Sequence, residues 1–243
     1  MVPSLKLTPQ FIFQKCTTIM PRYYTIASSS LAHPTELTLA VSLSTIETGL
    51  GKTRDGLTSG YLNDIFTRMQ AGEEVKETSK AFVNASNFVQ APDHSTPLIM
   101  VGPGTGVVPY IGFMQEREQA KKDNAELQLG PASLYFGCRQ QDSDFIYRDE
   151  MASFYDHKVI DSLNVALSRP KEDGAKKQYV QDILRGHQDL VKTYMLEKGG
   201  HFFVCGATKM GKDVEALVRE IVGEDEFKKL QAEKRYKVEL WSS

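Results

Sequence analysis

The stretch Leu98-Ile99-Met100-Val101-Gly102-Pro103-Gly104-Thr105-Gly106 places an apolar run directly before a glycine-rich turn. The apolar run predicts a buried strand, because such runs are typical of strands that are covered on both faces. Pro109 follows where the first turn of a helix accepts proline, since an N–H group there has no partner within the helix. The stretch therefore predicts a strand, a tight loop and a helix, which is the unit of parallel α/β sheets.

The loop itself has the chemistry of a phosphate site. Gly104 and Gly106 let the backbone approach a ligand closely, and the N–H groups at the start of the helix favour an anion. The hydroxyl of Thr105 can add a hydrogen bond. The loop is not a Walker A motif, because no Gly-Lys-Ser/Thr follows, and it lacks the spacing of the G-x-G-x-x-G fingerprint. A plain tight turn is the alternative for the loop alone.

Toward the C-terminus, apolar runs alternate with helical patterns. The pattern predicts strands over 98–101, 133–137, 162–167, 201–204 and 236–241, with helices over 109–123, 147–156, 177–196 and 209–221. Strands that alternate with helices indicate βαβ units and a parallel sheet with helices on both faces. We therefore expect a complete α/β domain over residues 94–243.

Residues 1–93 have a different pattern of apolar and polar residues. Alternating and branched residues predict strands over 23–27, 37–43, 82–83 and 88–89. A turn over 51–56 leads to a predicted helix over 57–69, with Thr58 or Ser59 as its N-cap. Strands with one helix between them predict part of a small antiparallel barrel.

The composition excludes several classes of protein. The chain has 243 residues, of which 41% are hydrophobic and 25% charged, as in ordinary globular proteins. Its net charge of −2 lacks the basic excess of a nucleic-acid binder, so no nucleic-acid partner is expected. No window is apolar enough for a membrane helix. Three scattered cysteines (Cys16, Cys138 and Cys205) do not make a zinc site, and no metal is expected. A hydrolase is disfavoured too, because no G-x-S-x-G or H-E-x-x-H motif occurs.

The segment from Gly102 to Arg117 resembles the NADPH-binding loop of the NADPH–cytochrome P450 reductase family, the diflavin reductases. The segment from Arg22 to Ser30 resembles the FAD motif of the same family. Further motifs follow in the order of the family: Tyr135–Arg139, Asp144–Glu150, Leu167–Arg169, Lys177–Gln181, Val204–Gly206 and Val238–Ser242. The resemblance runs from about Pro21 to Ser242. It implies a ferredoxin-reductase-like α/β nucleotide-binding domain, preceded by part of an antiparallel β flavin-binding barrel.

The resemblance assigns FAD binding to the first part of the chain. Arg22 would pair with the FAD pyrophosphate, since a guanidinium fork matches phosphate oxygens. Tyr24 would stack on the flavin ring. A second phosphate segment would offer N–H groups at the start of a helix, and it comprises Gly56, Leu57, Thr58 and Ser59.

The resemblance also assigns NADP(H) to the second part. Two hydroxyls and two cations would hold the 2′-phosphate, and they belong to Ser168, Arg169, Lys177 and Tyr179. A site for NAD would more often place a carboxylate on the ribose 2′-OH. Arg139 and Gln181 would join the nucleotide site, and Gly104, Thr105 and Gly106 would hold the pyrophosphate.

The chemistry that the resemblance implies is hydride transfer from nicotinamide C4 to flavin N5, which the cofactors themselves carry out. Thr25 would hydrogen-bond near flavin N5, and Cys205 would lie beside the nicotinamide. Glu239 would stabilise the positive charge that grows on the nicotinamide ring. Trp241 would cover the flavin and move to admit the nicotinamide. These four residues are the expected catalytic group.

Four positions depart from the family pattern. Thr25 stands where serine is usual, and Glu239 where aspartate is common. Ala207 replaces a common aspartate, and Asn84 a frequent basic residue. A displacement on the order of 1 Å can cost about 100-fold in rate. We therefore expect these departures to affect the turnover rate rather than the type of reaction.

Relatives of this kind carry an FMN-binding domain ahead of the FAD motif, so we expect the chain to be part of a longer protein. Its partners would be that FMN domain and a haem protein such as cytochrome P450. The expected location is the cytoplasm, or the cytosolic face of the endoplasmic reticulum if an N-terminal anchor is present. Exposed strand edges invite pairing, so self-association through the barrel edge is a further expectation.

Two alternatives remain open at this point. One is a single-flavin enzyme of the ferredoxin reductase or cytochrome b5 reductase type. The other is a module that binds NADP(H) without a flavin and catalyses nothing, because only part of the barrel is present.

Overall fold

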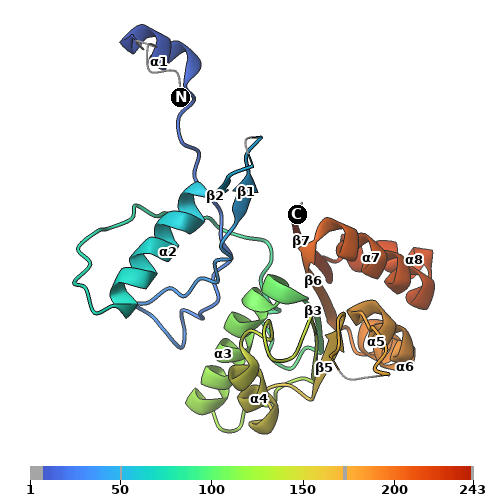
Figure 1. Cartoon of the computed structure of the whole chain (residues 1–243). Coiled ribbons are helices and arrows are strands. Elements are labelled where there is room, and N and C mark those ends of the chain that lie inside the picture. The colour runs from blue at the N-terminus through green and yellow to red at the C-terminus, as the bar shows by residue number, and fades with distance from the viewer. Residues whose placement is uncertain (1–7, 50, 172–173, 242–243) are drawn as a thin grey trace.

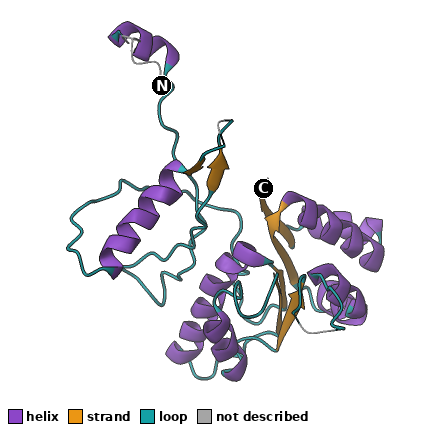
Figure 2. Cartoon of the chain, in the orientation of Figure 1, coloured by secondary structure: helices purple, strands orange, loops and turns teal. Residues whose placement is uncertain are grey.

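The computed structural model describes residues 8–49, 51–171 and 174–241. A five-stranded sheet with strand order β5-β4-β3-β6-β7 dominates its second part (Figures 1 and 2). All four neighbouring pairs in it are parallel. The strands are β3 (Leu98–Val101), β4 (Ala132–Cys138), β5 (Ser162–Leu167), β6 (His201–Ala207) and β7 (Tyr236–Trp241). The predicted parallel sheet is confirmed, and the predicted strand at the end of the chain joins it as β7.

The helices of this part connect the strands. They are α3 (Val108–Asp123), α4 (Arg148–Asp156), α5 (Val180–Gly186), α6 (Gln188–Lys192), α7 (Thr208–Val222) and α8 (Glu224–Ala232), with single turns η1 (Gly104–Val107) and η2 (Thr193–Glu197). The single helix predicted over 177–196 is wrong. It begins only at Val180 and breaks at His187, whose backbone (φ −108°, ψ 29°) is not helical. Gly186, a weak helix former, comes directly before this break.

Apolar residues alternate between the two faces of the sheet. Ile99 and Val101 of β3 face one core with α5, α6, η2, α7 and α8, while Leu98 and Met100 face the other with α3 and α4. The same alternation separates Phe202 from Phe203 in β6. Figure 1 shows α3 and α4 on one side of the sheet and α5 to α8 on the other. Covering both faces excludes water from the strands and leaves their carboxyl ends for a site.

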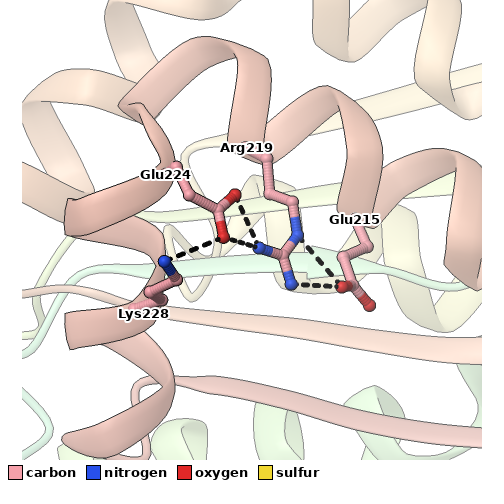
Figure 3. A network of polar contacts seen from close by, with 4 residues as sticks. All are labelled: Glu215, Arg219, Glu224 and Lys228. Atoms are coloured by element: carbon pink, nitrogen blue, oxygen red, sulfur yellow. Dashed lines mark hydrogen bonds and ion pairs between the residues drawn. The ribbon is translucent and has the colours of Figure 1, made fainter.

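The corner between α7 and α8 is held by charged side chains (Figure 3). Arg219 donates to Glu215 at 2.8 Å and to Glu224 at 2.6 Å, so its guanidinium bridges the two helices. The same guanidinium lies 4.1 Å from the ring centre of Phe227. Helix α8 was not predicted from the sequence. Gly223 with φ 88°, followed by an acidic first turn, is the signal that marks its start.

The first part differs from the predicted barrel strands. It contains α1 (Pro9–Lys15), α2 (Leu57–Gln70) and a two-stranded antiparallel sheet of β1 (Thr45–Glu47) and β2 (Thr53–Asp55). The strands predicted over 23–27 and 37–43 meet only in the single bridge between Ile26 and Leu39. Those over 82–83 and 88–89 do not form in the described residues, where no neighbouring strand supplies ladder hydrogen bonds.

Helix α2 confirms the helix predicted over 57–69, although its start differs. The N-cap is Gly56 rather than Thr58 or Ser59, and β2 occupies part of the predicted turn over 51–56. The hydroxyl of Ser59 instead accepts a hydrogen bond from the backbone N–H of Ser44 at 3.2 Å. Within the described part of the chain, none of the helices has the length and apolar character needed to cross a membrane.

Candidate functional site

The glycine-rich loop lies at the carboxyl end of β3, the middle strand of the sheet. Gly104 begins η1 with φ +56°, a conformation that favours glycine, and α3 follows at Val108. In the described part of the chain, no capping side chain bonds the backbone N–H groups at the start of η1 or α3. A helix of 16 residues adds the positive end of its dipole. The loop therefore fits a phosphate.

Close packing beneath the loop requires its other glycines. A Cβ atom on Gly106 would lie 2.1 Å from the carbonyl oxygen of Cys205, and one on Gly102 would lie 2.7 Å from the ring of Tyr110. The hydroxyl of buried Tyr110 donates to the carbonyl of Val101 at 3.0 Å, directly before the loop. Sequence reasoning missed Tyr110. The signal for it was its place on the apolar face of the helix that follows the loop.

Three of the predicted catalytic residues come together at the carboxyl ends of β6 and β7. Cys205 is fully buried in β6 and is the register partner of Glu239 in β7. Thr25 donates its hydroxyl proton to Oε1 of Glu239 at 3.0 Å. Burial, and then the charge of Glu239, raise the pKa of the Cys205 thiol. Cys205 is therefore a neutral thiol at physiological pH.

Trp241, the fourth predicted catalytic residue, is the last residue of β7 and pairs in register with Ala207. Its half-buried side chain packs against the core that contains Tyr110 and Cys205. The hydroxyl of Thr208, the first residue of α7, donates to the carbonyl of Trp241 at 3.0 Å. Sequence reasoning missed Thr208, because nothing in the sequence showed that the start of α7 meets the end of β7.

Predicted 2′-phosphate residues gather beyond the ends of β4 and β5. Arg139 follows β4, Ser168 and Arg169 follow β5, and the N–H of Arg169 donates to the carbonyl of Arg139 at 2.8 Å. The N–H of Gln178 bonds the carbonyl of Leu167 at 2.9 Å, which fixes the next loop against the end of β5. This cluster combines cations and a hydroxyl, as a phosphate dianion requires.

The loop before α5 carries the remaining members of this cluster. The ammonium of Lys177 lies 4.7 Å from the ring centre of Tyr179, which is 43% exposed. Asp182 accepts from the N–H of Tyr179 at 2.8 Å and anchors the start of α5. Gln181 differs, because its side chain lines a hollow of about 280 Å³ between α5 and α7 together with Arg185 and others. Its Oε1 is buried without a hydrogen-bond partner in the described residues.

The predicted FAD residues of the first part lie on two separate segments. Arg22 is exposed, and its side chain donates to the carbonyl of Met20 at 2.5 Å and to no other group among the described residues. Tyr24 is half-buried. The segment from Gly56 to Ser59 forms the N-terminal turn of α2, and the N–H of Gly56 bonds Ser44 at 2.7 Å. Among the described residues, no hydrogen bond joins the two segments.

The three groups lie in a row along the carboxyl ends of the strands. The cations follow β4 and β5, the phosphate loop follows β3, and Cys205 and Glu239 lie on β6 and β7. Neighbouring strands are about 4.8 Å apart, so the loop at β3 lies roughly 10 Å from either outer strand. The row includes the point between β3 and β6 at which the order of the strands reverses. In open α/β sheets, ligands bind at such points. The residues present therefore fit a dinucleotide that carries an additional phosphate.

Comparison with known proteins identifies families and relatives that the chain resembles. The family described as "Oxidoreductase NAD-binding domain" matches residues 100–216, and the family described as "FAD binding domain" matches residues 1–61. The NADPH–cytochrome P450 reductases of Cavia porcellus and Homo sapiens are each 36% identical to the chain over 99% of its length. The reductase of Drosophila melanogaster is 35% identical over 92% of the chain. The chain spans about a third of the length of these relatives, 36%, 36% and 33% in turn.

Proposed function

Because this chain belongs to the NADPH–cytochrome P450 reductase family and matches its C-terminal part, we propose that it transfers hydride from NADPH to FAD. The single observation that carries the proposal is the row of three groups along the carboxyl ends of the strands. Phosphate-binding cations stand at one end of it, and the bonded pair of Thr25 and Glu239 stands at the other. We divide the chain into a flavin-binding part over residues 1–93 and a nucleotide-binding domain over residues 94–243.

The nucleotide domain holds NADP(H) by charge and by backbone donors. Arg169 and Lys177 neutralise the 2′-phosphate, while Ser168 and Tyr179 add hydroxyl groups and Arg139 a further cation. Gly104, Thr105 and Gly106 place the backbone of η1 at the pyrophosphate. Gln181, on the first turn of α5, is proposed as a further nucleotide contact, which would require its side chain to turn out of the hollow beside α7.

The first part holds FAD through two phosphate contacts and one ring contact. Arg22 has exposed N–H groups for a pyrophosphate, and Gly56, Leu57, Thr58 and Ser59 present the uncapped N-terminus of a 14-residue helix. Tyr24 stacks on the flavin. The donor set fits a dinucleotide phosphate, because it combines a guanidinium with free backbone N–H groups.

When bound, NADPH and FAD supply the hydride donor and acceptor, and the protein orients them. Glu239 places a carboxylate at the nicotinamide end of the row, where it stabilises developing positive charge. Thr25 holds that carboxylate and offers a hydroxyl on the flavin side. Cys205 stays protonated and would contact the nicotinamide, and Trp241 would cover the flavin and move to admit the nicotinamide.

In the longer protein that the relatives represent, electrons would pass from FAD through FMN to a haem protein such as cytochrome P450. The name of the relatives, NADPH–cytochrome P450 reductase, supports this choice of acceptor. The same likeness leads us to propose action in the cytoplasm, or at the cytosolic face of the endoplasmic reticulum where an N-terminal anchor is present. Subcellular fractionation of the tagged protein would test that location.

Self-association is a separate proposal. Each strand of the β1–β2 sheet pairs on one side only among the described residues, and unpaired edges can bind another chain. Solution scattering at several concentrations should show a mass that rises with concentration. A constant monomer mass would exclude this pairing.

The absorbance spectrum tests the main proposal. Purified protein should show a flavin spectrum that bleaches when NADPH is added without oxygen, and more slowly with NADH. A colourless protein that binds NADPH would instead support a nucleotide-binding module without a flavin. Equal bleaching by NADH would contradict the 2′-phosphate site, and a colourless protein that binds neither nucleotide would refute the proposal for this chain.

A further inference from the structure

The first turn of α7 is attached to the last residue of β7. Thr208 follows β6 directly and opens α7, and its hydroxyl donates to the carbonyl of Trp241 across 3.0 Å. The bond joins residues 33 positions apart in the chain. The N-cap residue before Thr208 is Ala207, which has no side-chain oxygen that could cap α7.

A second contact shows that α7 lies close to the same end of β7. A Cβ atom on Gly211 would lie 2.5 Å from the end of the Leu240 side chain, so a larger residue there would require that side chain to shift. Leu240 immediately precedes Trp241 and packs on the core beneath α7. The helix therefore touches β7 through two consecutive residues, by packing at Leu240 and by a hydrogen bond at Trp241.

The attachment matters because β7 is an edge strand. Among the described residues it pairs with β6 alone, and Trp241 is the last residue in that register. Strand ends with a partner on one side open more easily than the centre of a sheet. The Thr208 hydroxyl adds a second hold on the Trp241 backbone, from the helix rather than from the sheet.

The position of the Trp241 ring depends on this backbone. Residues in a strand alternate between faces, so Glu239 and Trp241 point to the same side. On that side Trp241 packs against the core that includes Cys205. Movement of the Trp241 backbone would carry the indole relative to Cys205 and Glu239.

We propose that Thr208 is a positioning residue that fixes Trp241 at the end of the site and thereby sets the enzyme's preference for NADPH over NADH. The inference rests on the proposed function, in which Trp241 must give way to the nicotinamide. When the Trp241 backbone is fixed, the nicotinamide displaces the Trp241 ring only if the other end of the nucleotide, its adenosine phosphate, is firmly bound. The 2′-phosphate cluster provides that anchor for NADPH and provides less for NADH.

Fluorescence tests the contact without any cofactor, because Trp241 is the only tryptophan in the chain. Thr208→Val keeps the shape of the side chain and removes the hydroxyl. We expect the open state of the strand end to become roughly two- to tenfold more populated, which is the usual net effect of one hydrogen bond. Acrylamide quenching of the cofactor-free protein should rise accordingly, and Thr208→Ser should restore the wild-type value.

Thr67 supplies a matched control. Its hydroxyl donates to the carbonyl of Asn63 at 2.8 Å within α2, so Thr67→Val removes the same kind of bond outside the site. Quenching in this variant should equal that of the wild type. If Thr208→Val perturbs folding, as circular dichroism would show, Thr208→Ala makes the same comparison. Unchanged quenching in the folded Thr208 variant, or equal increases in Thr208→Val and Thr208→Ser, would overturn the proposal.

Kinetics tests the consequence for selectivity. In Thr208→Val we expect the NADPH-to-NADH ratio of kcat/KM to fall roughly two- to tenfold, mainly through better use of NADH. Increased quenching with an unchanged ratio would overturn the link to selectivity. If the wild-type protein binds neither NADPH nor flavin, the proposed function fails, and fluorescence alone then decides whether Thr208 holds Trp241.

Discussion

Thr25 and Glu239 are separated by 214 positions in the chain, and a 3.0 Å hydrogen bond joins them. Thr25 lies on the segment assigned to the flavin, whereas Glu239 lies on the edge strand of the nucleotide domain. Their bond orients the carboxylate beside buried Cys205, its register partner. The threonine and the glutamate, two positions expected from the resemblance to depart from the family pattern, therefore form one contact. The glutamate is one methylene longer than an aspartate, and it accepts a hydrogen bond from a threonine, which is one methyl larger than a serine.

Removing this contact should slow hydride transfer. In Thr25→Val we expect flavin reduction by NADPH to fall on the order of 10- to 100-fold, because an oriented polar group at the reacting centre is lost. The Kd for NADPH should change little, since the phosphate contacts are untouched. Stopped-flow absorbance measures both. Thr25→Ser keeps the hydroxyl and should remain near wild type, and a Val variant as fast as wild type would show that the contact is only structural.

The cation cluster should control nucleotide choice. Arg169→Ala and Lys177→Ala should each raise the Kd for NADPH about tenfold or more, the effect of losing one charged hydrogen bond. The Kd for NADH should stay the same. Isothermal titration calorimetry with both nucleotides measures the difference, and Lys192→Ala on α6 is the control for loss of an exposed cation. An equal loss of affinity for NADH would show that these cations support nucleotide binding in general rather than the 2′-phosphate.

The packing of the phosphate loop predicts a stability effect. Gly106→Ala should lower the free energy of unfolding by about 1–3 kcal/mol, because its methyl group meets the backbone of Cys205. Urea denaturation measures this change. Gly186, at the end of α5, has no atom within 4 Å of its virtual Cβ, so Gly186→Ala should be neutral or slightly stabilising. Equal stability of the two variants would contradict the observed packing.

The lowered pKa of His201 should make the stability of the protein depend on pH. Burial, and then Lys237 and Arg235, lower the pKa of His201 from 6.5 to about 4. Between these values the unfolded chain binds more protons than the folded one, so stability rises with pH across this window and falls as the pH drops through it. His201→Gln should remove part of that fall, on the order of 1 kcal/mol given the partial exposure of the ring. Unfolding at pH 4.5 and pH 7.5 measures it, and the same pH slope in both proteins would refute the assignment.

The sheet could be predicted because its signals are local. Runs such as Leu98–Val101 are apolar without alternation, as strands covered on both faces must be, and glycine and proline mark their ends. The break at His187 was missed because helical periodicity continues on both sides of it. The segments over 23–27 and 37–43 have strand composition, but a strand also requires a partner, which composition does not show.

The site shows the same limit. Motif order placed Thr25, Cys205 and Glu239 in one group, and the structure brings these three together. The contact between Thr208 and Trp241 could not be foreseen, because it depends on how closely α7 crosses the end of β7. Gln181 shows the converse. Its place in a motif gives no information about the direction of its side chain, which lines a hollow beside α7.

The strand order also has a consequence for the folding pathway. β3, β4 and β5 are consecutive in the chain and adjacent in space, whereas β6 must return to the other side of β3 after about 100 intervening residues. Short loops close at lower entropic cost than long ones, so we expect the β3-β4-β5 half to assemble first. That half carries the phosphate loop and the cation cluster. A partly folded chain should therefore bind an adenosine phosphate before it can accommodate a nicotinamide.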